Sequence, residues 1–237
     1  MKKGWQRRPL GELCDIRNGS TPSKGNPAFW IGGAIPWFTI DDIRSQGRSI
    51  TTTRQKITPT ALSGTSVKLL PVDSVLLCCT ASVGEFAIAR IPLTTNQQFN
   101  GLVVRDHSQL DPDFLFFYAA TLKDELLELS GKTTIDFVPI SRLRDIMVSF
   151  PPLPEQQRIV RILDEAFDGI ATAKVNTEKN LQNARELFES ALQGMYESAG
   201  KNWATLQQKC KQVRLVARCI NLIMLLMVSL LLIRKIS

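Results

Sequence analysis

The sequence has few of the residues on which catalytic and metal sites depend. Its 237 residues include one histidine, His107, which precedes a polar loop and has no serine or cysteine context that would make it a catalytic base. The cysteines are odd in number and form no CxxC pair, which argues against a disulfide framework and a zinc site. They are Cys14, Cys78, Cys79, Cys210 and Cys219. Cys78 and Cys79 end an apolar run, which favours buried strand residues over nucleophiles.

Nucleotide-binding and metal-binding motifs are also missing. The stretch Gly131-Lys132-Thr133-Thr134 resembles the end of a phosphate-binding loop, but Leu126 stands where that loop needs another glycine. There is no GxGxxG cradle, and the carboxylates do not have metal-binding spacing. We therefore expect no cofactor, no metal and no catalytic residue, and interpret the chain as non-enzymatic.

The N-terminus lacks the apolar stretch of a signal peptide. Residues 1–10 are basic, and Trp5 and Pro9 stand where a signal peptide would have its apolar stretch. This pattern predicts a cytoplasmic protein.

Acidic residues are scarce in two parts of the chain, so the net charge of +7 is unevenly spread. Residues 194–237 contain seven basic groups and one acidic group, and residues 1–56 contain ten and four, whereas residues 57–150 contain seven and ten. A basic surface on the folded domain is therefore expected from its N-terminal part.

Within residues 17–56, cationic side chains alternate with short polar ones, as in segments that contact phosphates and base edges. A second candidate for DNA contact is a run of three amide side chains at 96–98, which can pair with adenine or bond to their own backbone. A solvated loop surface is the alternative for the basic segment. The predicted DNA-binding residues are Arg17, Asn18, Ser20, Lys24, Arg44, Arg48, Lys56, Asn96, Gln97 and Gln98.

Residues 1–150 show the pattern of a mixed α/β domain. Short apolar runs separated by turn residues predict strands at 13–17, 34–39, 74–79, 86–91 and 101–105. One helix is expected from Asp111, which can cap it, through Pro112 at its first position, to Gly131.

The prolines at 151, 152 and 154 mark the exit from this domain, and a helical apolar stripe of about 38 residues follows. At about 1.5 Å per residue this helix is about 57 Å long, too long to be buried on a domain of 150 residues. We expect it to pair with another helix as in a coiled coil; a solvated helix that packs only locally is the alternative. The predicted pairing residues are Ile159, Leu163, Ala166, Ile170, Leu181, Ala184 and Phe188.

The last segment, residues 194–237, contains a nearly continuous apolar run at 219–233 between basic residues. Fifteen residues are fewer than the roughly 20 that span a bilayer. A weak membrane helix, a partner-binding helix and an extension without a role are all open, and we favour the last.

Several motifs occur in the order found in one known family. The sequence resembles the target-recognition domain and spacer of specificity subunits of type I restriction-modification systems, over about residues 4–193. The motifs are LGELCDI at 10–16, NGSTPS at 18–23, NP at 26–27, FW at 29–30, IPW at 35–37, TASVG at 80–84, TNQQF at 95–99 and FPPLPEQQRIV at 150–160.

The resemblance implies a target-recognition domain at 1–150 that reads one half of a split DNA target and a spacer helix at 151–193, with a tail of unknown role at 194–237. It also implies modification (methyltransferase) and restriction (endonuclease) subunits as partners, which would hold the methyl donor and hydrolyse ATP.

No second copy of the PLPEQ or TNQQ motifs is present. We therefore expect a half-length subunit that pairs with a second copy, in a homodimer, through residues 155–193. The alternatives are a tail-anchored or relic protein that no longer assembles and, disfavoured by the missing methyl-donor loop, a self-contained modification enzyme.

Overall fold

The computed structural model describes residues 4–130 and 137–198. By its internal contacts the chain divides into two units, of which the first ends at Ala166 and the second begins at Phe167. Each is described by itself. The apolar run at 219–233 lies outside the described residues, and no helix within them is long and apolar enough to cross a membrane.

The centre of the first unit is a five-stranded sheet. Its order is β2 (Cys14–Asn18), β9 (Phe99–Val104), β6 (Val75–Cys78), β7 (Phe86–Ala89) and β4 (Ser49–Ile50). All neighbours are antiparallel except β7 and β4, which are parallel. Successive strand residues point to opposite faces, so Leu77 belongs to one core cluster and Leu76 to another. The sheet is therefore buried on both faces.

The first core cluster is covered by short helices and a two-stranded ribbon. These are α1 (Leu10–Leu13), α4 (Pro112–Ala119), α5 (Lys123–Ser130) and α6 (Ile140–Asp145), with β1 (Gln6–Pro9) paired to β10 (Met147–Phe150). The mixed α/β class is confirmed, and each of the five expected strands corresponds to an observed one within two residues at either end.

The single helix expected from Asp111 to Gly131 is wrong, because two helices occupy this stretch. Thr121 N donates to Tyr118 O (2.9 Å) and Leu122 N to Ala119 O (3.2 Å), so a tight turn separates α4 from α5. The predicted start is right, since Asp111 Oδ1 accepts from the backbone N–H of Asp113, and Pro112 is the first helical residue. Gly131 lies outside the described residues.

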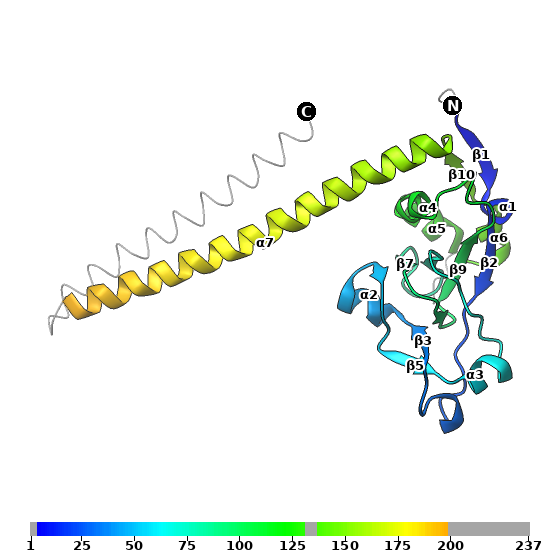
Figure 1. Ribbon diagram of the computed structural model, residues 1–237, viewed down its shortest axis with the longest axis horizontal. Helices are drawn as coiled ribbons and strands as arrows, with labels where there is room; N and C mark the ends of the chain where they lie inside the picture. Colours follow the sequence, from blue (N-terminus) through cyan, green and yellow to red (C-terminus); the bar gives the residue numbers. More distant parts are fainter. Residues whose placement is uncertain (1–3, 131–136, 199–237) are drawn as a thin grey trace. The chain divides into compact units, whose positions relative to one another are not determined.

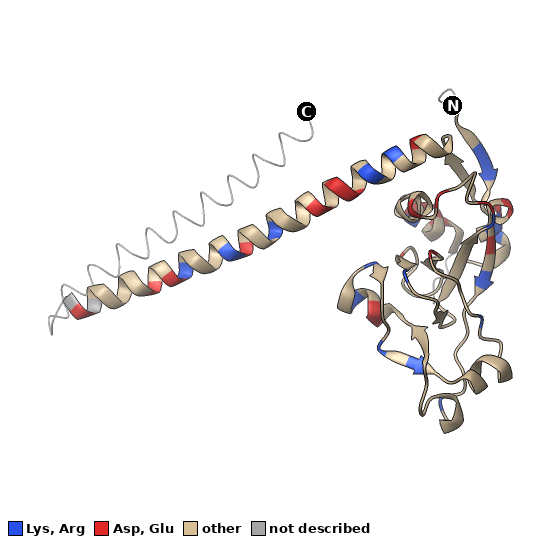
Figure 2. Ribbon diagram, viewed as in Figure 1, with Lys and Arg blue, Asp and Glu red and all other residues tan. Residues whose placement is uncertain are grey.

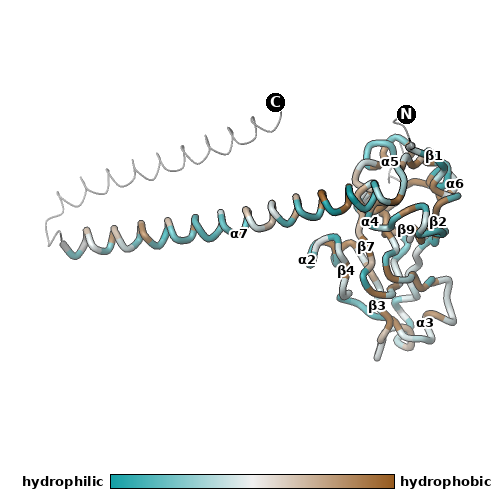
Figure 3. Tube along the Cα trace, turned by 45° about the horizontal axis from the view of Figure 1, so that its top comes forward, coloured by the Kyte–Doolittle hydropathy of each residue, from teal (hydrophilic) through white to brown (hydrophobic). Residues whose placement is uncertain are grey.

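A three-stranded sheet lies at the end of the first unit opposite β1 and β10 (Figures 1 and 3). Its order is β5 (Gln55–Ile57), β3 (Ile35–Phe38) and β8 (Thr94–Thr95). Around it are the 3-10 helix η1 (Pro27–Phe29), α2 (Ile40–Gln46) and α3 (Pro59–Gly64). A third core cluster here is built on Trp37, Ile57, Ala61 and Val67.

Helix α7 (Leu153–Ser198) has 46 residues and extends five residues beyond the predicted end. At about 1.5 Å per residue it is about 69 Å long. Pro154 is tolerated in its first turn, where a backbone N–H has no partner within the helix. Ile159 and Val160 pack on the first core cluster.

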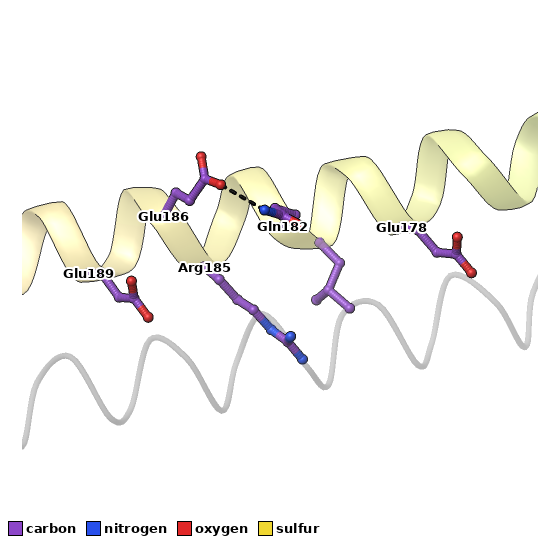
Figure 4. A pocket seen from close by; sticks show the side chains of 6 residues that line it. Glu178, Gln182, Arg185, Glu186 and Glu189 are labelled. Carbon is purple, nitrogen blue, oxygen red and sulfur yellow. Dashed lines mark hydrogen bonds between the residues drawn. The ribbon is translucent and has the colours of Figure 1, made fainter.

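The second unit begins within α7, and large apolar side chains stay exposed along the helix. Ile170 is 57% exposed and Leu181 is 41% exposed. The residues between them along the helix are mostly polar or charged. After Leu181, Gln182 Nε2 donates to Glu186 Oε1 at 3.0 Å (Figure 4). The helix thus has an apolar stripe that local packing does not bury in the described part of the chain.

The first turn of α7 is anchored by one buried amide. Gln156 is fully buried, and its Oε1 accepts from Asp111 N (2.8 Å). Its Nε2 donates to Gln109 O (2.7 Å) and Pro151 O (2.8 Å). One side chain thus satisfies three backbone groups from two different loops.

We predict that Gln156→Leu lowers the free energy of unfolding by about 3 kcal/mol, because buried backbone groups lose their partners. Urea unfolding of the full chain measures this. Gln157→Leu is the matched control: its side chain is exposed, and we expect a change within about 0.5 kcal/mol. Equal losses in the two variants would contradict the anchoring role of Gln156.

Candidate nucleic-acid interface

Two loops that carry predicted DNA-binding residues interlock beside the three-stranded sheet. Gly19 N donates to Phe99 O (3.0 Å) and Ser20 N to Thr95 O (2.9 Å). Thr21 Oγ1 also donates to Gln97 Oε1. A Cβ on Gly19 would lie 2.0 Å from Asn96 O, so only glycine fits this crossing. The structure therefore brings the segment at 18–21 together with the amides at 96–98.

The three amides differ in their surroundings. Asn96 is buried, its Oδ1 accepts from Gln98 N (3.1 Å) and its Nδ2 donates to Gln98 Oε1 (3.0 Å). These bonds within the loop favour a loop-shaping role for Asn96 and Gln98. Gln97 is exposed, as is Asn18. Direct base contact therefore stays a prediction chiefly for Gln97 and Asn18.

Lys24 is held by two tryptophans that we did not predict as part of the site. Its Nζ lies 3.6 Å from the ring centroid of Trp30 and 4.4 Å from that of Trp37, and it donates to Gln55 Oε1 (2.8 Å). The indoles meet edge to face at 5.0 Å. Partial burial against them lowers the pKa of Lys24. The ammonium is thus fixed in place before any ligand binds.

Three other predicted phosphate contacts already have carboxylate partners. Arg17 Nε lies 2.8 Å from Asp15, Arg44 Nη1 lies 3.4 Å from Asp41 and Arg48 Nη2 lies 3.4 Å from Glu85. These pairs are at least partly exposed, so each contributes little to the stability of the fold. A phosphate can therefore replace the carboxylate as the partner of the arginine. These three arginines have a carboxylate beside them, whereas none of the ion pairs among the described residues involves Lys24 or Lys56.

We define the basic lobe as residues 19–38 and 53–70, which surround the third core cluster. This part of the sequence contains Lys24, Arg54, Lys56 and Lys68 and no aspartate or glutamate. In Figure 2 its strands β3 and β5 and helix α3 carry no acidic colour. Arg54 and Lys68 are exposed and were not among the predicted contacts. The signal in the sequence that could have identified them is the absence of aspartate and glutamate from residues 53–70.

Groups that could act as nucleophiles are poorly placed for it. Burial raises the pKa of Cys14 to about 12 and that of Cys79 to about 11, so neither thiol is ionised at neutral pH. His107 is exposed in a loop. Within residues 4–130 and 137–198, no three His, Cys, Asp or Glu side chains are grouped as metal ligands.

The described part of the chain thus combines an α/β domain that carries a basic lobe with a long helix that carries an exposed apolar stripe. The family model for the type I restriction modification DNA specificity domain matches residues 2–183. The chain belongs to this family.

Named relatives agree with this assignment. The chain is 34% identical over 166 residues to the EcoprrI specificity subunit of Escherichia coli, covering 66% of this chain and 41% of that protein. It is 31% identical over 189 residues to the MjaIX specificity subunit of Methanocaldococcus jannaschii, covering 79% and 44%. The chain thus spans less than half the length of these relatives.

Two solved structures have a similar fold over most of this chain. A structure described as the basis of complex assembly and conformational transition of the type I R-M system has a TM-score of 0.63 and 26% identity, covering 79% of this chain and 44% of that chain. The HsdS subunit from Thermoanaerobacter tengcongensis has a TM-score of 0.54 and 25% identity, covering 73% and 40%. The domain and the long helix are therefore shared with specificity subunits.

We predict that Gly19→Ala separates the two interlocked loops. Its methyl group would meet a backbone oxygen at 2.0 Å, which overpacks the crossing, and we expect a loss of about 2 kcal/mol in urea unfolding. Gly25→Ala is the control, since the nearest atom to its Cβ would be Ser23 Oγ at 3.9 Å. A Gly19→Ala variant as stable as Gly25→Ala would show that the crossing is not rigid.

Proposed function

We propose that this chain is a DNA sequence-specificity subunit that reads one half of a bipartite target and directs type I modification and restriction subunits to it. The observation that carries the proposal is the match of the specificity-domain family across the recognition domain and the following helix. The basic lobe supports it, because a surface with cations and no carboxylates attracts the phosphate backbone.

In this proposal phosphate contacts position the domain and the interlocked loops discriminate the bases. Lys24 and Lys56 contact phosphates directly. Arg17, Arg44 and Arg48 exchange their carboxylate partners for phosphates on binding. Gln97, Asn18 and Ser20 reach base edges in the groove.

The recognition domain would comprise residues 1–150, and the spacer residues 151–193. Contacts group the chain up to Ala166 with the domain, because the first turns of α7 pack on its core. The spacer pairs with the helix of a second copy through its exposed stripe and sets the distance between half-sites. Ile159, packed on the core, contributes less to pairing than Ile170 or Leu181.

The chain itself is non-catalytic in this proposal. Methyl transfer and ATP-dependent cleavage take place on the partner subunits, which bring their own cofactors. We propose no role for residues 194–237, and the cytoplasmic location stays a prediction.

We predict that a host expressing this chain with its modification subunit acquires methylation at a palindromic, split motif. A homodimer places two identical recognition domains about a two-fold axis, so the two half-sites are inverted copies. Sequencing of the host methylome identifies the motif. A host expressing the modification subunit alone is the control. An asymmetric motif would contradict the homodimer, and the absence of any motif would contradict the specificity role.

We predict that Ile170→Glu combined with Leu181→Glu halves the mass of the purified chain in light scattering, because charged residues cannot pack in a helix pair. Val175→Glu is the matched control: Val175 is 62% exposed on the same helix but lies off the stripe. We expect this control to keep the mass of the unchanged chain. A double variant with unchanged mass would refute pairing through the stripe.

A further inference from the structure

The turn between η1 and β3 exposes a large apolar side chain at its tip. Ile31 is 77% exposed, more than any other large hydrophobic residue in the described part of the chain. Gly32 follows with a φ of +72° and open space around it, and Gly33 comes next. Because the two residues after Ile31 have no side chain, the side chain of Ile31 projects alone from this part of the turn.

Two hydrogen bonds close this turn, and one side of it packs on the domain. Ile31 N donates to Pro27 O (2.9 Å), and Gly33 N donates to Trp30 O (3.2 Å). A Cβ on Gly33 would lie 2.6 Å from Lys56 O, so the turn packs directly on β5. Little conformational entropy is therefore lost when this tip docks into a partner.

One ammonium group lies over the ring of the residue that precedes the tip. Lys24 Nζ lies 3.6 Å from the ring centroid of Trp30, the residue before Ile31, and the backbone of Lys56 contacts Gly33. Single exposed apolar residues are common on protein surfaces. This one lies on a turn of the basic lobe, whose residues include four cations and no aspartate or glutamate. Charge complementarity therefore selects duplex DNA as its occupant.

We propose that Ile31 enters the major groove of the target and packs against the 5-methyl group of a thymine, as a specificity-determining residue. This inference rests on the proposed function. The thymine methyl is the apolar group that a base edge offers in the major groove. Insertion between stacked bases costs a few kcal/mol of unstacking energy per base step, and packing against a methyl group in the groove avoids that cost.

The test uses the chain in complex with its modification subunit, and two duplexes: one with the motif that the unchanged complex methylates, one with that motif scrambled. We expect Ile31→Ser to reduce the affinity ratio between them about tenfold, with an unchanged salt dependence. Val72→Ser, at a residue 44% exposed outside the basic lobe, should change neither. Lys56→Ala should lower the salt slope by about one and keep the affinity ratio.

A second measurement replaces each thymine of the motif by uracil, which removes only the methyl group. We expect one position at which uracil weakens binding of the unchanged complex but not of Ile31→Ser. An unchanged affinity ratio in Ile31→Ser, or no position that depends on Ile31, overturns this inference and leaves the proposed function standing. If the unchanged complex does not distinguish the two duplexes, the proposed function fails first.

Discussion

The buried amide of Gln156 connects the α/β domain to the start of α7, and the proposed use of that helix as a spacer depends on this contact. An apolar residue would leave the backbone groups of Asp111, Gln109 and Pro151 unsatisfied, and a carboxylate would offer no donor to the two carbonyls. The residue must therefore supply a donor and an acceptor at once. In the proposed role α7 can set a distance only if its first turn is held, so that role depends on this contact as well as on the length of the helix.

The candidate DNA-binding loops, at the other end of the domain, are also held in place by contacts with the rest of the fold. Here the central sheet holds them. β9 begins directly after the loop at 96–98 and lies between β2 and β6. The segment at 18–21 begins at the last residue of β2, the neighbour of β9, so these adjacent strands place both loops at the same end of the sheet. Loops fixed in this way can hold side chains precisely enough to discriminate bases.

Local signals in the sequence predicted much of this architecture. Alternating apolar runs identified five strands, and Asp111 with Pro112 identified the start of α4. The break between α4 and α5 was missed because apolar residues keep their helical spacing across the turn at Thr121. Strands of two or three residues, such as β4 and β8, form only through partners distant in the chain. Similarly, the contact of Lys24 with Trp30 and Trp37 depends on tertiary packing that spacing alone does not reveal.

The distribution of carboxylates says more about the candidate interface than the net charge of +7 does. Arg44 has Asp41 three residues away and Arg48 faces Glu85, so the positive charge of these two arginines is locally offset. Within the lobe, no acidic side chain offsets Lys24 or Lys56. A domain with many unpaired cations would bind any DNA tightly, and its discrimination between sequences would be small relative to that binding. Pairing some of the cations with carboxylates limits non-specific affinity and leaves more of the binding free energy to base contacts.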